Sequence, residues 1–237
     1  MTFSLAGRCA RSGMLGCVVT TSSVAVGARC PHAAAGVGAV LTQHMTDPRL
    51  GPLGLEMLRL GYTPDQVVAG LVALTPRSDW RQIGVIDAHG RAATFTGASN
   101  KPEKGDIIGR DCLALANIVR SAEVPVAMVR AFEARPEEHI ARRLLDALRA
   151  GHAAGSEFAP LVATALLVVD RHAFPFVDLR VDGDPDPVAA LERLWAEYAP
   201  LADLYVQRAT DPDSVVRTHH GTPAGDAAPA QPLPPGA

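Results

Sequence analysis

The chain has 237 residues, of which 48% are hydrophobic, 20% charged and 5% aromatic. A chain of this length can bury one sizeable core, so we expect a single domain over residues 2–208. The formal net charge is −3, with 22 Lys+Arg and 25 Asp+Glu residues mixed along the sequence, and this argues against a nucleic-acid partner.

Strand patterns open the chain and a pair of helices follows. Thr63 and Gln66 have the spacing of a capping box, and Pro64 stands at the first helical position, so a helix is expected to begin there. The patterns predict a strand pair, a third strand and two helices at about 2–10, 14–21, 36–43, 52–60 and 64–74.

The second half repeats this alternation of strands and helix pairs. A hairpin is predicted first, then a loop rich in Lys, Gly and Pro, a strand, two helices, two strands and a last helix. We expect these elements at about 82–87, 92–97, 112–119, 121–134, 136–151, 161–169, 177–181 and from 186 onward. Residues 209–237 are rich in Pro, Ala and Gly, which predicts a disordered tail.

The order of these elements favours the α+β class. Strands and helices do not alternate one by one, so a parallel sheet of the Rossmann type is disfavoured. Antiparallel sheets packed on each other, with helix pairs outside, accommodate the order. We therefore expect a four-layer αββα sandwich.

The first thirty residues imitate a signal peptide, because basic residues precede an apolar run. Polar residues at 20–23 interrupt that run, and no stretch approaches the ~18 apolar residues that span a bilayer. The four cysteines form no C-x-x-C pair and have no histidine at metal-ligand spacing. We expect a cytoplasmic protein with free thiols, no membrane contact, no metal and no cofactor.

Thr2 is the residue that most clearly could take part in a reaction. It directly precedes a predicted strand, and its side chain is small enough for Met1 to be cleaved from it. An N-terminal threonine carries a hydroxyl nucleophile and an amine base in one residue. The reference pKa of that amine, about 7.7–8.0, suits proton transfer near neutral pH. A Met-Thr start without any catalytic role is the alternative.

Sequence blocks in the same order along the chain resemble the family catalogued as domain of unknown function 1028. The blocks are Thr2-Phe3-Ser4-Leu5, Val24-Ala25-Val26-Gly27, Gly36-Val37-Gly38-Ala39-Val40, Gly51-Pro52-Leu53-Gly54-Leu55, Arg81-Gln82-Ile83-Gly84-Val85-Ile86-Asp87, Phe95-Thr96-Gly97, Ala131-Phe132-Glu133 and Val177-Asp178-Leu179-Arg180. This resemblance implies a fold of the N-terminal nucleophile hydrolase type. It also implies Thr2 as the catalytic residue and hydrolysis of amide-type C–N bonds.

An oxyanion formed during such a reaction needs hydrogen-bond donors at about 2.7–3.1 Å. We expect Asn117 to supply one from its side chain, helped by a backbone amide near Gly36 or Gly38. The alternative for Asn117 is a strand-end residue that hydrogen-bonds its own turn.

Other polar residues near the predicted strand ends are expected to bind or orient the substrate or the amine. For Arg81, an ion pair with Asp79 or Asp87 is an alternative, and for the two serines turn capping is one. The expected binding or orienting residues are Ser22, Ser23, Gly36, Gln43, His44, Arg81 and Gln82.

Two functions from different classes follow. The first is an amide hydrolase in which Thr2 attacks a small amide or a cyclic ureide or imide, in a homo-oligomeric assembly. The second is a catalytically inactive member of the family that binds a ligand or serves in assembly. The sequence departs from the family pattern around 98–105, 115–117 and 158–164, which keeps the second open.

Overall fold

The computed structural model describes residues 1–101 and 103–215 and divides the chain into two compact units, Met1–Glu197 and a second that starts at Tyr198. The expected domain of residues 2–208 thus covers nearly all of the first unit and the start of the second. The second unit contains helix α6, Ala202–Thr210, so the predicted tail begins inside a helix. Residues 216–237 of that tail lie outside the described residues.

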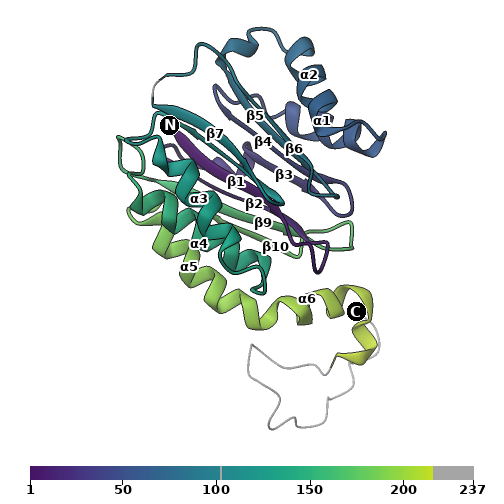
Figure 1. The fold of residues 1–237 in the computed structure, drawn as a ribbon. Helices are drawn as coiled ribbons and strands as arrows, with labels where there is room; N and C mark the ends of the chain where they lie inside the picture. The colour runs from purple at the N-terminus through teal and green to yellow at the C-terminus, as the bar shows by residue number, and fades with distance from the viewer. Residues whose placement is uncertain (102, 216–237) are drawn as a thin grey trace, which may run out of the picture. The chain divides into compact units, whose positions relative to one another are not determined.

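The first unit is built from antiparallel strands and helices (Figure 1). The strands are β1 Thr2–Arg8, β2 Leu15–Thr21, β3 Pro31–Ala34, β4 Gly38–His44, β5 Arg81–Asp87, β6 Ala92–Thr96, β7 Lys104–Gly109, β8 Cys112–Asn117, β9 Ala163–Val169 and β10 Val177–Val181. The helices are α1 Leu50–Arg59, α2 Pro64–Leu74, α3 Glu123–Glu133, α4 Ile140–Ala153 and α5 Pro187–Tyr198, whose last residue opens the second unit.

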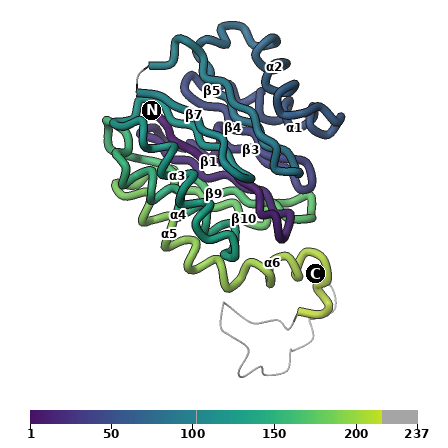
Figure 2. The backbone as a smooth tube through the Cα atoms, in the orientation of Figure 1, coloured from purple at the N-terminus to yellow at the C-terminus, as the bar shows by residue number. Residues whose placement is uncertain are grey.

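Two sheets form, and in both every neighbouring pair of strands is antiparallel. One sheet has the order β10-β9-β2-β1-β8-β7, and the other has the order β3-β4-β5-β6. The mixed α+β class with two antiparallel sheets is therefore confirmed. Figure 2 follows the backbone from the N-terminus directly into β1, which lies in the interior of the larger sheet between β2 and β8.

Side chains on alternate positions of β1 pack in opposite directions, as the pleat requires. Ser4 faces the smaller sheet, because its hydroxyl donates to the side chain of Gln43 on β4. Phe3 faces the helices and contacts Gly151 of α4. One apolar cluster joins the facing sides of the two sheets, and its buried members are Ala6, Cys17, Ala39, Leu41, Ile86, Leu113 and Leu115.

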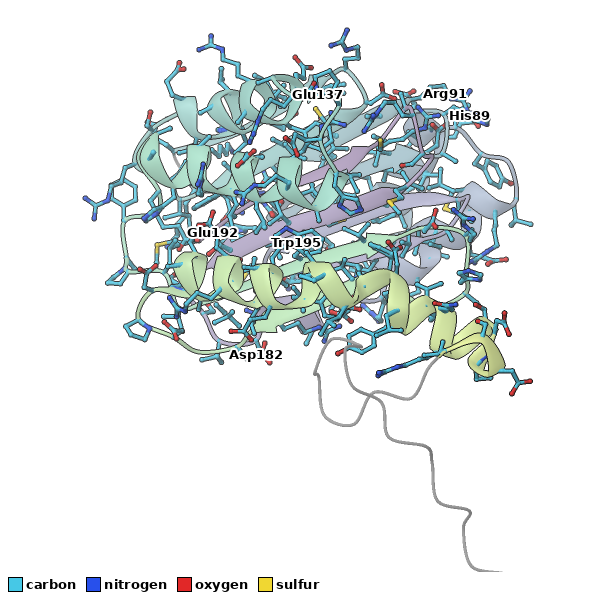
Figure 3. All side chains as sticks on the ribbon, turned by 90° about the horizontal axis from the view of Figure 1, so that it is seen from below. His89, Arg91, Glu137, Asp182, Glu192 and Trp195 are labelled. Atoms are coloured by element: carbon cyan, nitrogen blue, oxygen red, sulfur yellow. The ribbon has the colours of Figure 1, made fainter. Side chains whose placement is uncertain are left out.

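Helices cover the outer face of each sheet. A second cluster joins α1 and α2 to the smaller sheet, with Val67 and Leu71 of α2 packed against Ile83 and Val85. Helices α3 and α4 cover the larger sheet, and α5 lies beside α4. Figure 3 shows Glu192 and Trp195 on α5; Trp195 stacks on His139 with ring centroids 5.6 Å apart.

The sequence predicts the positions of most helices and hairpins well. It does not predict β3 and β7, two of the strands at the edges of the sheets. The capping box between Thr63 and Gln66 is present. Helix α4 begins at Ile140 rather than at Pro136, because the side chain of His139 caps it. Strands β3 and β7 were not expected; β7 reads as a loop by composition and forms by pairing with β8 along its length.

Within the described part of the chain, no helix is both long enough and apolar enough to cross a membrane. All four cysteines are buried free thiols, as expected.

We predict that Gly84→Val disrupts the contact between the sheets. A Cβ at Gly84 would lie 2.5 Å from Leu113 Cδ1 and 3.2 Å from Leu115 Cδ1, so the larger side chain overpacks the core. We expect a loss of about 1–3 kcal/mol in the free energy of unfolding, measured with urea. Gly183→Val is the matched control, because a Cβ there meets nothing within 4 Å. Equal stability of the two variants would contradict this account of the interface.

Candidate active site at the start of the central strand

Thr2 is the first residue of β1 and is only 6% exposed. Its Cα pairs with Asn117 at the end of β8, and Phe3 pairs with Thr20 on β2. Because Ser4 faces the smaller sheet, Thr2 points in the same direction, into the space between the sheets. The two neighbouring strands thus hold the Thr2 hydroxyl at the end of the inter-sheet core.

The backbone of Met1 engages the hydroxyl groups at this point. Both Thr2 Oγ1 and Thr21 Oγ1 donate to the carbonyl oxygen of Met1, and the two hydroxyl oxygens lie 3.4 Å apart. Cleavage of the Met1–Thr2 bond removes this carbonyl and leaves an α-amine on Thr2. Both hydroxyls are then released together.

A buried chain of amide side chains lies just inside Thr2. Ser4 Oγ donates to Gln43 Oε1 at 2.7 Å, and Gln43 Nε2 donates to Gln82 Oε1 at 2.7 Å. Asn117 Nδ2 donates to the same Gln82 oxygen at 3.1 Å. All four side chains are fully buried, so the chain of hydrogen bonds joins the two sheets without contact with solvent.

The orientation of each amide in this chain follows from Gln82. Its Nε2 donates to the carbonyl oxygens of Gly105 and Ala116, which can only accept. Its Oε1 must therefore face Gln43 and Asn117, and both must donate to it. The Oδ1 of Asn117 consequently points away from Gln82, and it is buried with no hydrogen-bond partner among the described residues.

Glu157 closes the end of β1, a role that the sequence does not signal. Its Oε2 accepts the backbone N–H of Ser22 at 3.0 Å, just after β2 ends, and its backbone pairs with Val119, just after β8 ends. Since β1 lies between β2 and β8 and runs antiparallel to both, Glu157 lies directly beyond the first residues of β1. It stands in an irregular loop, where no spacing marks it.

The carboxylate of Glu157 and the N-terminal amine influence each other electrostatically. Glu157 is 2% exposed, and burial raises the pKa of its carboxyl group to about 7, although the amine and the Ser22 N–H oppose this rise. Burial also lowers the pKa of the Met1 amine, while Glu157 acts to raise it. The second carboxylate oxygen of Glu157, Oε1, is buried and has no hydrogen-bond partner among the described residues.

A cavity of about 440 Å³ opens at Thr2 and collects several of the expected residues. Its lining residues are Met1, Thr2, Thr21, Ser23, Arg29, Cys30, His44, Met45, Thr46 and Arg81. Of the residues expected at the site, Thr2, Ser23, His44 and Arg81 therefore line the same cavity. Arg29, Cys30 and Thr21 were not expected there.

The remaining expected residues have other positions. Ser22 contributes its backbone N–H to Glu157, and Gln43 and Gln82 belong to the buried amide chain. Gly36 lies in the turn before β4, whereas His44 is the last residue of that strand and lines the cavity. Strand β4 has seven residues, each spanning about 3.3 Å, so Gly36 lies at the far end of the strand from the cavity. The expectation of a site role for Gly36 was therefore wrong: its glycine pattern marks a turn with φ of 68°.

Arg81 and His44 are held at the cavity by specific contacts. Arg81 does not pair with Asp79 or Asp87; it donates to the carbonyl oxygen of Met45 and lies 4.0 Å from Asp47. His44 has a φ of 67°, and its Nδ1 lies 2.9 Å from the carbonyl oxygen of Trp80. Burial lowers the pKa of His44, which favours the neutral imidazole at neutral pH.

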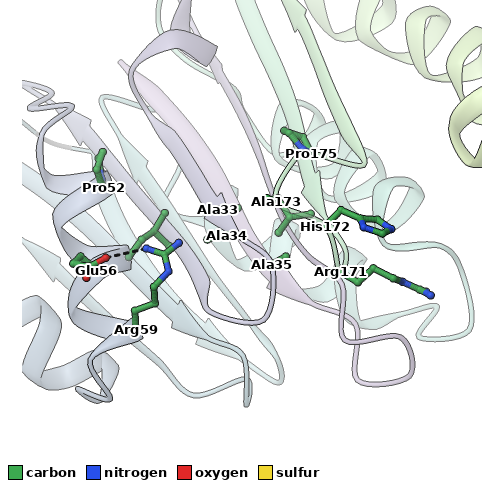
Figure 4. Close-up of a pocket in the computed structure, with 12 residues that line it drawn as sticks. Ala33, Ala34, Ala35, Pro52, Glu56, Arg59, Arg171, His172, Ala173 and Pro175 are labelled. Atoms are coloured by element: carbon green, nitrogen blue, oxygen red, sulfur yellow. Dashed lines mark hydrogen bonds and ion pairs between the residues drawn. The ribbon is translucent and has the colours of Figure 1, made fainter. Parts of the chain in front are cut away.

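A larger cavity of about 690 Å³ lies elsewhere, between α1 and the loop that follows β9 (Figure 4). Val169 at its edge pairs with Leu15, which is at the opposite end of the β1–β2 hairpin from Thr2. Of its charged residues, Glu56 and Arg59 pair with each other at 3.0 Å, and Arg171 pairs with Asp170 at 2.9 Å. Among residues 1–101 and 103–215, no three His, Cys, Asp or Glu side chains gather as a metal-binding group.

Comparison with known proteins places the chain in a family. A search of curated proteins finds no match. The crystal structure of protein SPO2555 from Silicibacter pomeroyi, a DUF1028 protein, is similar with a TM-score of 0.77 and 30% sequence identity, over 84% of this chain and 89% of that one. The model of the family of unknown function DUF1028 matches residues 2–191. The chain therefore belongs to the DUF1028 family.

Proposed function

We propose that the protein is a small-molecule amide hydrolase of the N-terminal nucleophile type, in which cleavage of Met1 makes Thr2 the first residue. One observation carries the proposal: the Thr2 hydroxyl is buried at the start of a central strand, at a cavity, with a buried carboxylate beyond it. A hydroxyl, an amine and a group that orients the amine are the parts that such a nucleophile needs.

The layered architecture supports this class of fold. The strand that carries the proposed nucleophile has a neighbour on each side, and both sheets have a helix pair on their outer face. These features support the proposal of an αββα sandwich of the N-terminal nucleophile hydrolase type. Fold alone does not determine activity, so the proposal rests on the groups around Thr2.

The reaction proceeds in two halves. Thr2 Oγ1 attacks the amide carbonyl carbon while its proton passes to the α-amine of Thr2. The C–N bond breaks, the leaving nitrogen takes that proton, and the acyl group remains on Thr2 as an ester. A water molecule then attacks the ester carbonyl and gives a proton to the amine. The amine passes this proton to Thr2 Oγ1 as the ester C–O bond breaks, which releases the acid and restores the free hydroxyl and the neutral amine.

Glu157 and Asn117 are suited to hold the α-amine. Both carry a buried oxygen without a partner among the described residues, and both lie beside the first residue of β1. An α-ammonium offers three donors and would satisfy both oxygens. We therefore assign Asn117 to the amine rather than to the oxyanion. The Thr21 hydroxyl, released from Met1, is the better candidate for an oxyanion donor.

The cavity size favours a small substrate. About 440 Å³ is within the range of small-molecule sites, and a small amide or a cyclic ureide or imide fits it. A homo-oligomeric assembly remains a prediction.

The alternative is a family member without catalytic activity that binds a ligand. The arrangement that favours it is the engagement of both hydroxyls by the Met1 carbonyl, with Met1 itself lining the cavity. If Met1 stays in place, the amine is on the wrong residue and Thr2 has no base.

We predict that the purified protein lacks Met1 and that a β-lactone probe acylates Thr2. Intact-mass and peptide mass spectrometry measure both. Thr2→Ala should abolish acylation and lower kcat/KM for any hydrolysed amide at least about 10³-fold, because the nucleophile is lost. Thr210→Ala on α6 is the control and should keep full activity. Retention of Met1 in an active protein would exclude this mechanism.

We predict that Glu157→Gln lowers the pKa of the Thr2 amine. Glu157 acts to raise the pKa of the Met1 amine, and we expect it to stabilise the ammonium form of the Thr2 amine in the same way, so its removal favours the neutral amine at lower pH. The pH dependence of amine acetylation by acetic anhydride, followed by mass spectrometry, measures this without any substrate. Where turnover is measurable, the rising limb of kcat/KM should move to lower pH as well.

Two further variants serve as controls for this experiment. Glu157→Asp keeps the charge and should retain part of the shift, whereas Glu56→Gln on α1 should leave the titration unchanged. An identical titration in Glu157→Gln and the unaltered protein would show that the carboxylate does not contact the amine.

A further inference from the structure

The cavity at Thr2 has a basic wall. Arg29 and Arg81 line it, and none of its ten lining residues is an Asp or Glu, while the lining residue His44 is favoured as the neutral imidazole. Lys101 adds to this field, since its charge acts to lower the pKa of the Met1 amine and of His44. A cleft lined by one sign of charge concentrates ligands of the opposite sign.

Resting on the proposed amide hydrolase function, we propose that the substrate carries a carboxylate, which Arg29 and Arg81 bind beside Thr2. The scissile amide and the carboxylate then belong to one small molecule. Its acid group lies against the two guanidinium groups while its amide carbonyl faces the Thr2 hydroxyl.

Arg29 is oriented without being neutralised. Its Nη1 donates to the carbonyl oxygens of Val24 and Ala25 at 2.6 and 2.7 Å. These carbonyls carry no net charge, and Arg29 forms no ion pair with an acid of the described chain. Its remaining N–H groups form the planar fork that matches a carboxylate.

The turn that holds Arg29 is itself strained. Ala25 has a φ of 54°, in the left-handed region that residues with a Cβ rarely adopt. The N–H of Ala25 donates to the backbone carbonyl oxygen of Asp182 at 3.1 Å, which supports this conformation. With the turn in this conformation, the Val24 and Ala25 carbonyls both accept from Arg29, and these two bonds fix the position of the guanidinium.

The charge of Arg81 is also only partly balanced. Its nearest acid is Asp47, at 4.0 Å, and Asp47 already binds Arg49 through both carboxylate oxygens at 2.9 and 2.7 Å. Arg81 Nε is buried and has no hydrogen-bond partner among the described residues. A carboxylate bound at the outer N–H groups of this guanidinium would supply the missing charge.

A hollow that adjoins the Thr2 cavity also favours a negatively charged substrate over a positively charged one. It has a volume of about 280 Å³ and is lined by Met45, Arg77, Trp80 and Arg81, so it shares Met45 and Arg81 with the Thr2 cavity. Trp80 and Met45 give it an apolar wall, and Arg77 adds another cation. This hollow beside the Thr2 cavity therefore disfavours a positively charged substrate as well.

The test uses three primary amides of similar length that differ in charge: succinamate, succinamide and 4-aminobutanamide. Binding is measured by calorimetry on Thr2→Ala, so that turnover does not interfere. We expect succinamate to bind at least tenfold more tightly than succinamide, with 4-aminobutanamide the weakest. The preference should fall as salt is added, because exposed charge interactions are screened.

Variants assign the preference to the arginines. In the Thr2→Ala background, Arg29→Gln and Arg81→Gln should each weaken succinamate binding about tenfold and leave succinamide within twofold. Arg29→Lys, which keeps the charge but loses the planar fork, should give an intermediate loss. Arg59→Gln, in the separate cavity of Figure 4, is the matched control and should change nothing.

The outcomes separate this inference from the proposed function. Equal binding of the three amides, no binding of succinamate, or a charge preference that survives both arginine variants would overturn the inference. Ammonia release from any of the amides by the unaltered protein, lost in Thr2→Ala, would still support the hydrolase. Charge-ordered binding without ammonia release from succinamate would keep the carboxylate site and count against hydrolysis.

Discussion

The placement of β1 in the interior of the larger sheet is the constraint on which the site depends. A strand that has neighbours on both sides and that begins at Thr2 carries the N-terminal backbone into the protein. Polar groups there lose water and need partners within the fold. The Thr21 hydroxyl, the side chain of Asn117 and the carboxylate of Glu157 surround this point because β2 and β8 end beside it.

The amide chain through Gln43 and Gln82 links this point to the smaller sheet. Burying amides is costly unless each is hydrogen-bonded, and a satisfied set fixes one arrangement of its members. Because Gln82 donates to backbone carbonyls of β7 and β8, a slip of the smaller sheet past the larger would break several bonds at once. The network therefore sets the alignment of the sheets at the end where the cavity lies.

Sequence patterns predicted the elements whose positions depend on neighbouring residues. They failed for elements and site residues whose positions depend on contacts between distant segments. The capping box at Thr63 is local, so its position was correct. Strand β7 has glycines and a lysine and becomes a strand through its pairing with β8. Glu157 is a lone acid in a loop; it gains its role only because segments after β2 and β8 converge on it. Thr2 and Asn117 were both expected at the site and pair with each other on β1 and β8, and the bonds of Gln82 gave Asn117 a different proposed role.

If Met1 is removed, as the proposed function requires, the pairing of Thr2 with Asn117 limits when a processing enzyme can reach the Met1–Thr2 peptide bond. Before the segment that becomes β8 has been synthesised, one side of β1 lacks its partner and the bond is accessible. Once β8 docks, Thr2 is enclosed, and an aminopeptidase would need local unfolding to reach it. Removal of Met1 would then compete with folding on the ribosome. A molecule in which β8 docks before Met1 is removed would keep Met1.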